Sequence, residues 1–257
     1  TEVASAFELK DNVLSFSFPN GYDKNKELVI DPVLIFATYS GGTNMTFGWS
    51  AAYDAQGKLI SGGECFGVGW PVTLGSFQQT FGGSIDVGVN AYDPLGTSLI
   101  YSSYLGGSSS DLPCSMVCNS NDELVIAGTT GSSNFPTTAG CYDDTPNGSN
   151  DLFITVFDNA GTALLGSTYL GGSSTEGSAE HEVNIDASNT IYLSTVTSSS
   201  NFPTTAGAVQ TALQGNQDAV LIKMDSNCVN LLASTYLGGS ATDEGLGVLI
   251  KSNGEVV

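Results

Sequence analysis

The sequence predicts an all-β fold: a β-propeller segment with four-stranded antiparallel blades of about 65 residues each. Two observations predict it. Runs of β-branched and aromatic residues alternate with turns rich in Gly, Asn and Asp, as in a series of hairpins. A Tyr-Leu/Ser-Gly-Gly motif also recurs at steps of 65, 65 and 67 residues, in Tyr39–Gly42, Tyr104–Gly107, Tyr169–Gly172 and Tyr236–Gly239.

The middle repeat contains four predicted strands, which we call a, b, c and d in chain order. They are Cys114–Cys118, Glu123–Thr130, Asp151–Asp158 and Ala163–Leu170. The a–b and c–d connections consist of small polar residues that suit tight turns, whereas the b–c connection is a long loop. A β-solenoid coil takes only roughly 20–30 residues. One repeat is therefore a whole sheet, as in a propeller blade.

The same landmarks divide the chain into two parts. Residues 1–32 are expected to form a β-hairpin lead-in that ends a preceding domain, with strands at Ala4–Lys10 and Val13–Phe18. A closed ring of six to eight such blades needs roughly 390–520 residues, so we expect a piece of a longer protein that holds an incomplete ring. Residues 33–257 are the propeller segment: strand d at 33–42, blades at 43–107, 108–172 and 173–239, and a partial blade at 240–257.

Charge excludes several classes of partner. The chain has 26 acidic and 6 basic residues, all six of them lysines, and a net charge of −20. Nucleic-acid binding and docking to anionic lipid both need a basic surface, and phosphate recognition favours arginine. The longest uncharged stretch is rich in Ser, Thr, Asn and Gly, so no membrane insertion is expected.

Catalytic machinery is also missing from the pattern. His181 is the only histidine, which excludes a multi-histidine metal centre, and no G-x-S-x-G motif is present. His181 stands between Glu180 and Glu182 and is expected at the surface. We predict no catalytic, cofactor-binding or metal-binding residue.

One carboxylate recurs in each linker between blades, at Asp111, Glu176 and Asp243. Such residues near a propeller axis could form an acidic ring that holds Ca²⁺, which takes oxygen ligands. The alternative is that each carboxylate bonds backbone amides of its own linker. The second interpretation is favoured because no D-x-D-x-D-G loop accompanies these residues.

Other aspartates recur at strand ends. A first group lies at hairpin turns and is assigned to turn formation: Asp54, Asp93, Asp158, Asp186 and Asp225. A second group opens strand c of each blade: Asp86, Asp151 and Asp218. The two ends of strand c are roughly 23 Å apart, too far for a glycosidase pair, so we assign both groups to the scaffold.

Aromatic residues follow the same period. Trp70, Phe135 and Phe202 each precede a proline, and they are expected to fill the space between neighbouring blades rather than to form a glycan platform. Trp49 has no counterpart in the other repeats, and a solvent-facing role stays open for it.

Strand directions also constrain the five cysteines. Alternating strands place Cys65, Cys114 and Cys141 on one face and Cys118 and Cys228 on the other. A disulfide, if one forms, is expected to join two of the first three, with Cys228 free or bonded outside the chain. Cys114 and Cys118 are roughly 13 Å apart in an extended strand, too far to pair.

The combination of Tyr-Leu-Gly-Gly-Ser, an acidic linker and Phe-Pro-Thr-Thr-Ala-Gly resembles the SBBP family, a β-propeller repeat of secreted bacterial proteins. The resemblance covers residues 33–257. The first repeat departs from it, with Ser40 in place of Leu and Trp70-Pro-Val-Thr in place of Phe-Pro-Thr-Thr. The lead-in 21–34 is similar to the segment that precedes such repeats in large surface proteins of Bacteroidota. The resemblance implies export, often by the type IX route, and a link to adhesion or gliding.

From these observations we expect a non-catalytic scaffold or interaction module of a secreted or cell-surface protein. Its partners would be a glycan or protein ligand and further blades or domains of the same polypeptide. The binding surface is predicted on the b–c loop face, from Cys65 to Ser84 and its equivalents, because these loops are long and differ between blades. Two alternatives stay open: a propeller-fold glycan hydrolase or lyase, and a calcium-stabilised adhesin.

Overall fold

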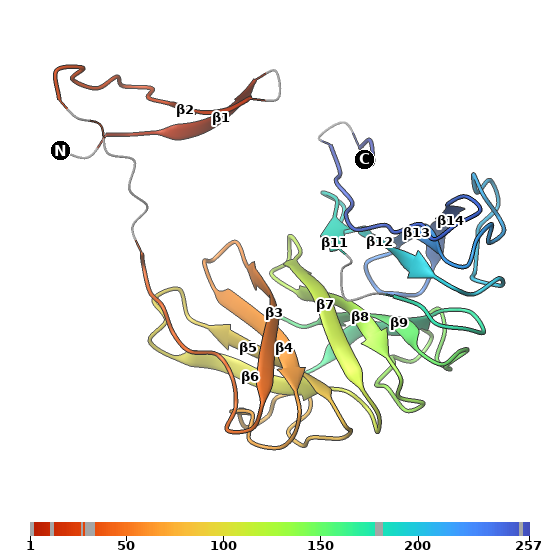
Figure 1. The fold of residues 1–257 in the computed structure, drawn as a ribbon. Helices are drawn as coiled ribbons and strands as arrows, with labels where there is room; N and C mark the ends of the chain where they lie inside the picture. Colours follow the sequence, from red (N-terminus) through yellow and green to blue (C-terminus); the bar gives the residue numbers. More distant parts are fainter. Residues whose placement is uncertain (1–2, 11–12, 27, 29–33, 178–181, 252–253) are drawn as a thin grey trace. The chain divides into compact units, whose positions relative to one another are not determined.

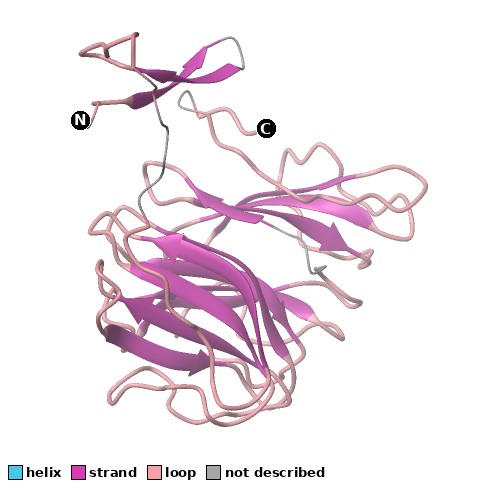
Figure 2. Cartoon of the chain, turned by 60° about the vertical axis from the view of Figure 1, so that its left-hand side comes forward, coloured by secondary structure: helices cyan, strands magenta, loops and turns pink. Residues whose placement is uncertain are grey.

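The computed structural model of the chain describes residues 3–10, 13–26, 28, 34–177, 182–251 and 254–257. Glu180 and His181 lie outside these residues. The chain divides into two compact units, Thr1–Ile35 and Phe36–Val257, which we describe separately (Figure 1). The described residues contain strands, turns and loops but no helix (Figure 2). Among them, accordingly, no helix is long and apolar enough to cross a membrane.

The first unit contains one hairpin, in the region where the sequence predicts one. β1 (Ala6–Lys10) pairs antiparallel with β2 (Val13–Ser17), so that Ala6 lies opposite Ser17. After β2, the rings of Phe18 and Tyr22 make an edge contact, with centroids 5.0 Å apart.

The second unit contains three four-stranded antiparallel sheets, each with its strands in chain order. Sheet 1 consists of β3 (Thr46–Tyr53), β4 (Leu59–Cys65), β5 (Asp86–Tyr92) and β6 (Leu99–Leu105). Sheet 2 consists of β7 (Asp111–Cys118), β8 (Leu124–Thr130), β9 (Asp151–Phe157) and β10 (Leu164–Leu170). Sheet 3 consists of β11 (Glu182–Ile185), β12 (Ile191–Thr197), β13 (Asp218–Met224) and β14 (Leu231–Leu237).

The predicted a, b, c and d strands of each full repeat thus form a separate four-stranded sheet. Their first strands are neighbours in space, since β7 contacts both β3 and β11. The turn aspartates explain why these hairpins form: each accepts hydrogen bonds from backbone N–H groups two to five residues further on, as at Asp54, Asp93, Asp158, Asp186 and Asp225.

Two predicted segments do not form strands of a sheet. Residues 33–42 were expected as strand d, and residues 34–42, the described part of this range, contain no strand. Phe36 nevertheless takes the place of a d-strand residue: its ring fills the space next to Gly96, as the ring of Tyr101 does next to Gly161. Both glycines have positive φ, so a side chain there would be strained as well as obstructed. Residues 240–257 likewise form only isolated bridges.

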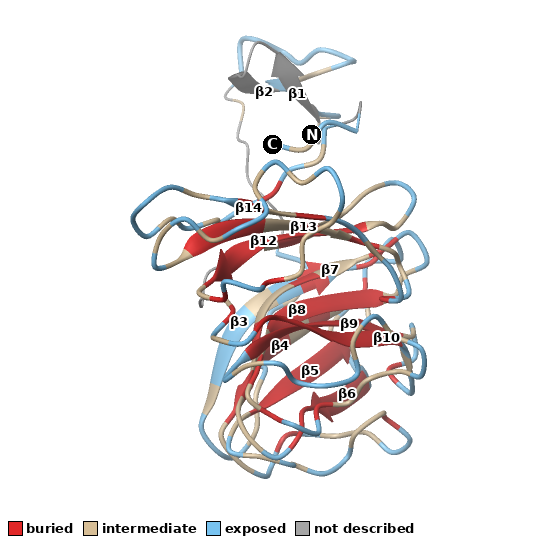
Figure 3. Cartoon of the chain, turned by 90° about the vertical axis from the view of Figure 1, so that its right-hand side faces the viewer, coloured by how far each residue is buried: buried red, intermediate tan, exposed pale blue. Residues whose placement is uncertain are grey.

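Apolar side chains fill the two spaces between adjacent sheets. One buried cluster combines sheets 1 and 2 and includes Val89, Tyr101 and Phe153. The other combines sheets 2 and 3 and includes Ile154, Leu193 and Val220. A third, smaller cluster consists of Cys65, Trp70 and Tyr104 of sheet 1 and its b–c loop. Strand β3 is exposed along much of its length and is pale where β4, β5, β8 and β9 are red (Figure 3).

A buried tyrosine fixes the start of each b–c loop. The Tyr169 hydroxyl accepts a hydrogen bond from Phe135 N at 2.8 Å and donates one to Ser132 O at 2.6 Å. Tyr236 does the same with Phe202 N and Ser199 O, and Tyr104 with Trp70 N and Gly67 O. The tyrosine of the Tyr-Leu/Ser-Gly-Gly motif therefore joins the end of strand d to the loop that leaves strand b.

Replacing Tyr169 by Phe tests this role. The change leaves the buried Phe135 N–H and Ser132 C=O without their partner, so we expect the free energy of unfolding to fall by about 2–3 kcal/mol. Urea denaturation followed by circular dichroism measures it. The control is Tyr53→Phe, since Tyr53 is 78% exposed and its change is expected to stay within about 0.5 kcal/mol. Equal losses in the two variants would contradict the assignment.

Candidate functional site

The linker carboxylates accept hydrogen bonds from backbone amides of their own linkers, which is the interpretation that the sequence favoured over a Ca²⁺-binding ring. Asp111 Oδ2 accepts from Gly107 N, and Asp243 Oδ2 from Gly239 N, both at 2.7 Å. Glu176 accepts from the amide of Gly172. Each therefore holds the turn that follows its own Gly-Gly pair.

The alternative, an acidic ring, has no counterpart in the part of the chain that the structure describes. No group of three or more His, Cys, Asp or Glu side chains there is placed to hold a metal ion. The strand-c aspartates have an arrangement that the sequence did not predict: Asp86 lies close to Asp111, and Asp151 lies close to Glu176, across the junction between adjacent sheets.

The repeated aromatic residues lie in the core. Trp70, Phe135 and Phe202 are 6%, 3% and 3% exposed. Phe135 belongs to the cluster between sheets 1 and 2, and Phe202 to the cluster between sheets 2 and 3. None of the three rings is therefore available as a glycan platform. The exposed apolar residues of the b–c loops are not these aromatic residues but aliphatic ones such as Leu74 and Val209.

Trp49 instead lines a pocket among the first strands of the sheets, which we call the inner-strand pocket. Its volume is about 210 Å³. Its lining residues are Trp49, Glu64, Leu112, Pro113, Cys114, Thr129, Asn150, Thr175, Glu176 and Gly177. Glu64 and Thr129 lie one residue before the ends of β4 and β8, so the pocket is at the end of the sheets from which the b–c loops leave.

Two β-bulges direct side chains into this pocket. The pairing of β3 with β4 shifts between Gly48 and Ser50, which leaves Trp49 as the extra residue. The pairing of β7 with β8 shifts in the same way at Cys114. A bulge re-aims the extra side chain and bends its strand. Equivalent bulges on two neighbouring first strands therefore place Trp49 and Cys114 at the same pocket.

Glu64 provides the charge of the pocket. Burial raises the pKa of its carboxyl group, and a hydrogen bond from Trp49 partly offsets the increase. Burial, followed by the nearby charge of Glu64, raises the pKa of Cys114 to about 12. The Cys114 thiol is therefore protonated at neutral pH and is not an activated nucleophile.

The inner-strand pocket breaks the symmetry of the repeat. Thr129 and Val196 occupy the position of Glu64 in the next two sheets, and Cys114 occupies the position of Trp49. The sequence signals were the unmatched Trp49 and the unmatched Glu64. These two signals could not be combined from the sequence, because the pocket brings together residues of sheets 1 and 2, the b–c loop of sheet 2 and the linker into sheet 3.

The prediction that Cys141 and Cys228 lie on opposite faces is wrong. Tyr142 N donates to Cys228 O at 2.8 Å, so Cys141 lies beside the turn that contains Cys228. The reason is the path of the b–c loop, which runs along β10 instead of staying at one end: Thr138 N bonds Ser167 O and Tyr169 N bonds Asp143 O. No disulfide joins any of the five cysteines, all of which are described residues.

Comparison with known proteins identifies one short region. The family model of a domain of unknown function, DUF7948, matches residues 1–33. This match covers the lead-in hairpin and none of the three sheets. No curated protein matches the chain.

Titration of Glu64 is expected to be visible in Trp49 fluorescence. In a Trp70→Phe background Trp49 is the only tryptophan, since the chain has two, and Phe already occupies the equivalent position in the other sheets. Because the pKa of Glu64 is raised above its ordinary 4.5, the emission should change with a midpoint above that value.

The matched variant adds Glu64→Gln, which keeps the shape of the side chain and removes its titration. The fluorescence change should then disappear. An unchanged midpoint in Glu64→Gln would show that another group titrates beside Trp49.

Proposed function

We propose that the chain is a non-catalytic β-propeller segment that serves as a scaffold and interaction module of a secreted or cell-surface bacterial protein. The observation that carries the proposal is the identical connection between successive sheets. A parallel bridge joins Asn150 to Thr175 at the junction of sheets 2 and 3, with equivalents at Ile85–Ser110 and Gln217–Thr242. Each sheet is thus attached to the next in the same way, as blades around an axis would be.

Two further features support a propeller. The first strands of the three sheets are neighbours, which is expected when they surround an axis. The third sheet also continues into Thr242, whose bridge to Gln217 repeats the first step into a further blade. The extracellular location, the type IX route and the link to adhesion rest on the resemblance of the repeat to the SBBP family.

Within this function we propose that the inner-strand pocket binds one neutral sugar residue of a glycan. Trp49 is 46% exposed and offers an aromatic face, while Glu64, Asn150 and Thr129 offer polar atoms beside it. Sites of drug-sized ligands measure roughly 300–1,000 Å³, so a pocket of about 210 Å³ suits a smaller group. The two glutamates of the lining and the net charge of −20 disfavour acidic sugars.

A propeller-fold glycan hydrolase is the second candidate, and one observation favours it. Glu64 and Glu176 line the same pocket, and burial raises the pKa of both. A glycosidase requires two carboxyl groups, of which one has a raised pKa and acts as the acid while the other stays ionised. Against this, Glu176 is 1% exposed and already accepts hydrogen bonds from Thr197 and Ser199, which fits a structural role better.

Binding of neutral oligosaccharides can be measured by isothermal titration calorimetry, which needs no tryptophan reporter. We expect saturable binding with a dissociation constant near 1 mM, about −4 kcal/mol, and loss of binding in Trp49→Ala. The control is Leu74→Ala, because Leu74 is 97% exposed on the b–c loop of sheet 1.

The outcomes separate the proposals. Binding that survives Trp49→Ala but is lost in Leu74→Ala would move the site to the b–c loops. Release of reducing ends from a polysaccharide, abolished by Glu64→Gln, would establish the hydrolase instead of the binding module.

A further inference from the structure

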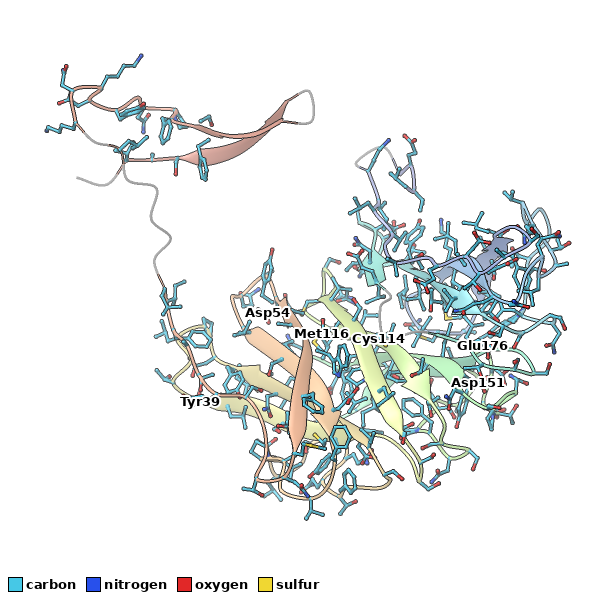
Figure 4. All side chains as sticks on the ribbon, viewed as in Figure 1. Tyr39, Asp54, Cys114, Met116, Asp151 and Glu176 are labelled. Atoms are coloured by element: carbon cyan, nitrogen blue, oxygen red, sulfur yellow. The ribbon has the colours of Figure 1, made fainter. Side chains whose placement is uncertain are left out.

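Pairs of buried carboxyl groups lie at the junctions between adjacent sheets. In each pair, the first residue of strand c in one sheet meets the carboxyl group of the linker into the next. Asp86 and Asp111 are both 0% exposed, and Asp151 and Glu176 are both 1% exposed. Asp151 and Glu176 lie side by side between sheets 2 and 3 (Figure 4).

A glycine between the two carboxyl groups shows how close they are. A Cβ placed on Gly106 would be 2.7 Å from Asp86 Oδ1 and 2.8 Å from Asp111 Oδ2. A Cβ on Gly171 would likewise collide with Asp151 Oδ1 and Glu176 Oε2. The second glycine of the motif is crowded as well, since a Cβ on Gly107 would be 2.6 Å from Ser132 Cβ and one on Gly172 would be 2.5 Å from Ser199 Cβ. The first glycine must lack a side chain because two carboxyl groups occupy that space.

Most oxygens of these carboxyl groups accept hydrogen bonds. Asp111 accepts from Thr130, Ser132 and Gly107 N, and Glu176 Oε1 accepts from Thr197 and Ser199. Of the four facing oxygens, only Asp111 Oδ2 accepts such bonds. Four buried side-chain polar atoms of the described residues have no donor or acceptor partner, and three of them belong to these pairs: Asp86 Oδ1, Asp151 Oδ1 and Glu176 Oε2.

No cation compensates these oxygens. Salt bridges among the described residues involve Lys26, Lys58 and Lys251, and none of them reaches either pair. The titratable groups that face the pairs are acidic or neutral. They are Cys65 and Tyr104 beside Asp86, Tyr169 beside Asp111 and Asp151, Asp143 beside Asp151, Tyr236 beside Glu176, and Glu64 and Cys114 across the pocket from Glu176.

We propose that each pair shares one proton in an O–H···O hydrogen bond that joins adjacent sheets, and that loss of this proton with rising pH weakens the junction. Two facing carboxylates without a donor between them would repel each other in a buried place. One proton supplies the missing donor and removes one of the two charges. At the second junction Glu176 Oε2 donates and Asp151 Oδ1 accepts.

The surroundings suit a proton better than a metal ion. Ca²⁺ takes six to eight oxygen ligands, whereas each pair leaves only one or two oxygens without a partner, and the other neighbours are N–H and O–H donors. Burial raises the pKa of Asp86 to about 6 and that of Glu176 to about 7, and the neighbouring carboxyl group of Asp151 also raises the pKa of Glu176.

The sign of the pH dependence follows. The folded pKa of Glu176, about 7, is above its ordinary value of 4.5. Between these two pH values the native state therefore binds more protons than the unfolded state. The contribution to stability is complete below about pH 4.5 and is lost as the pH rises through about 7. Turn aspartates give the opposite pH dependence of stability, because the stabilisation from a lowered pKa is lost as the pH falls. Asp93 is an example, since hydrogen bonds from Ser98 and Thr97 lower its pKa. The informative window is therefore about pH 5 to 8.

The experiment compares melting temperatures of the full 257-residue chain and its variants across this window. In Glu176→Gln the amide N–H replaces the shared proton, so the melting temperature should depend less on pH than in the parent protein, with a difference on the order of 5 °C at about pH 8. Asp143→Asn is the matched control. It removes one negative charge next to Asp151 and leaves the pair intact, so its pH dependence should parallel that of the parent.

A direct measurement does not depend on stability. Carbon-13 NMR of the side-chain carboxyl groups should show one glutamate that titrates near pH 7 and is absent in Glu176→Gln. If Glu176→Gln does not fold, Asp151→Asn provides the same donor from the other partner and should have the same effect.

Two results would overturn the proposal. In the first, Glu176→Gln and Asp143→Asn change the pH dependence equally, which would assign the effect to net charge. In the second, about 1 mM Ca²⁺ restores the melting temperature of the parent at about pH 8 but not that of Glu176→Gln, which would make the pair a cation site and favour a calcium-stabilised protein.

Discussion

The connection from the outer strand of one sheet to the first strand of the next is the element on which the second unit depends. At the junction of sheets 2 and 3, the chain must turn at Gly171 and Gly172, pass Asn150 and form a parallel bridge at Thr175. All of this backbone lies against a buried part of the preceding sheet, so its polar groups need partners within the protein. The linker carboxylate supplies several of them at once, because one side chain accepts from the turn amide and from two hydroxyl groups.

The same constraint accounts for the unusual position of the acids. A protein with net charge −20 has many carboxylates at its surface, where water solvates them. At the junctions, however, burial is imposed by the path of the backbone, and the acids lie where charge is costly. The four carboxyl groups of the two pairs are at most 1% exposed, so bulk water does not solvate them. Stability of the stacked sheets and protonation of the junctions are therefore linked.

The pocket at the first strands arises from a different feature of the fold. Repetition makes each sheet a copy of the last, so a site of new chemistry requires residues that break the repeat. Trp49 and Glu64 do so in sheet 1, and the bulge at Trp49 turns its ring out of the ladder. The pocket also includes Glu176, which belongs to a junction. The junction and the candidate binding site thus share Glu176, so a change in the protonation of the junction is expected to affect the pocket.

The sequence by itself determined the repeat, the four strands of each sheet and their antiparallel order, because turn residues and β-branched runs act locally. It also identified Asp111 and Asp158 as backbone-bonding residues and assigned Phe135 to the space between sheets. Only the tertiary structure decided which distant residues meet. The pairing of Asp151 with Glu176 crosses two sheets, and Cys141 reaches Cys228 because a long loop runs along β10. Such contacts depend on how the sheets stack and where the loops run, which no local propensity encodes.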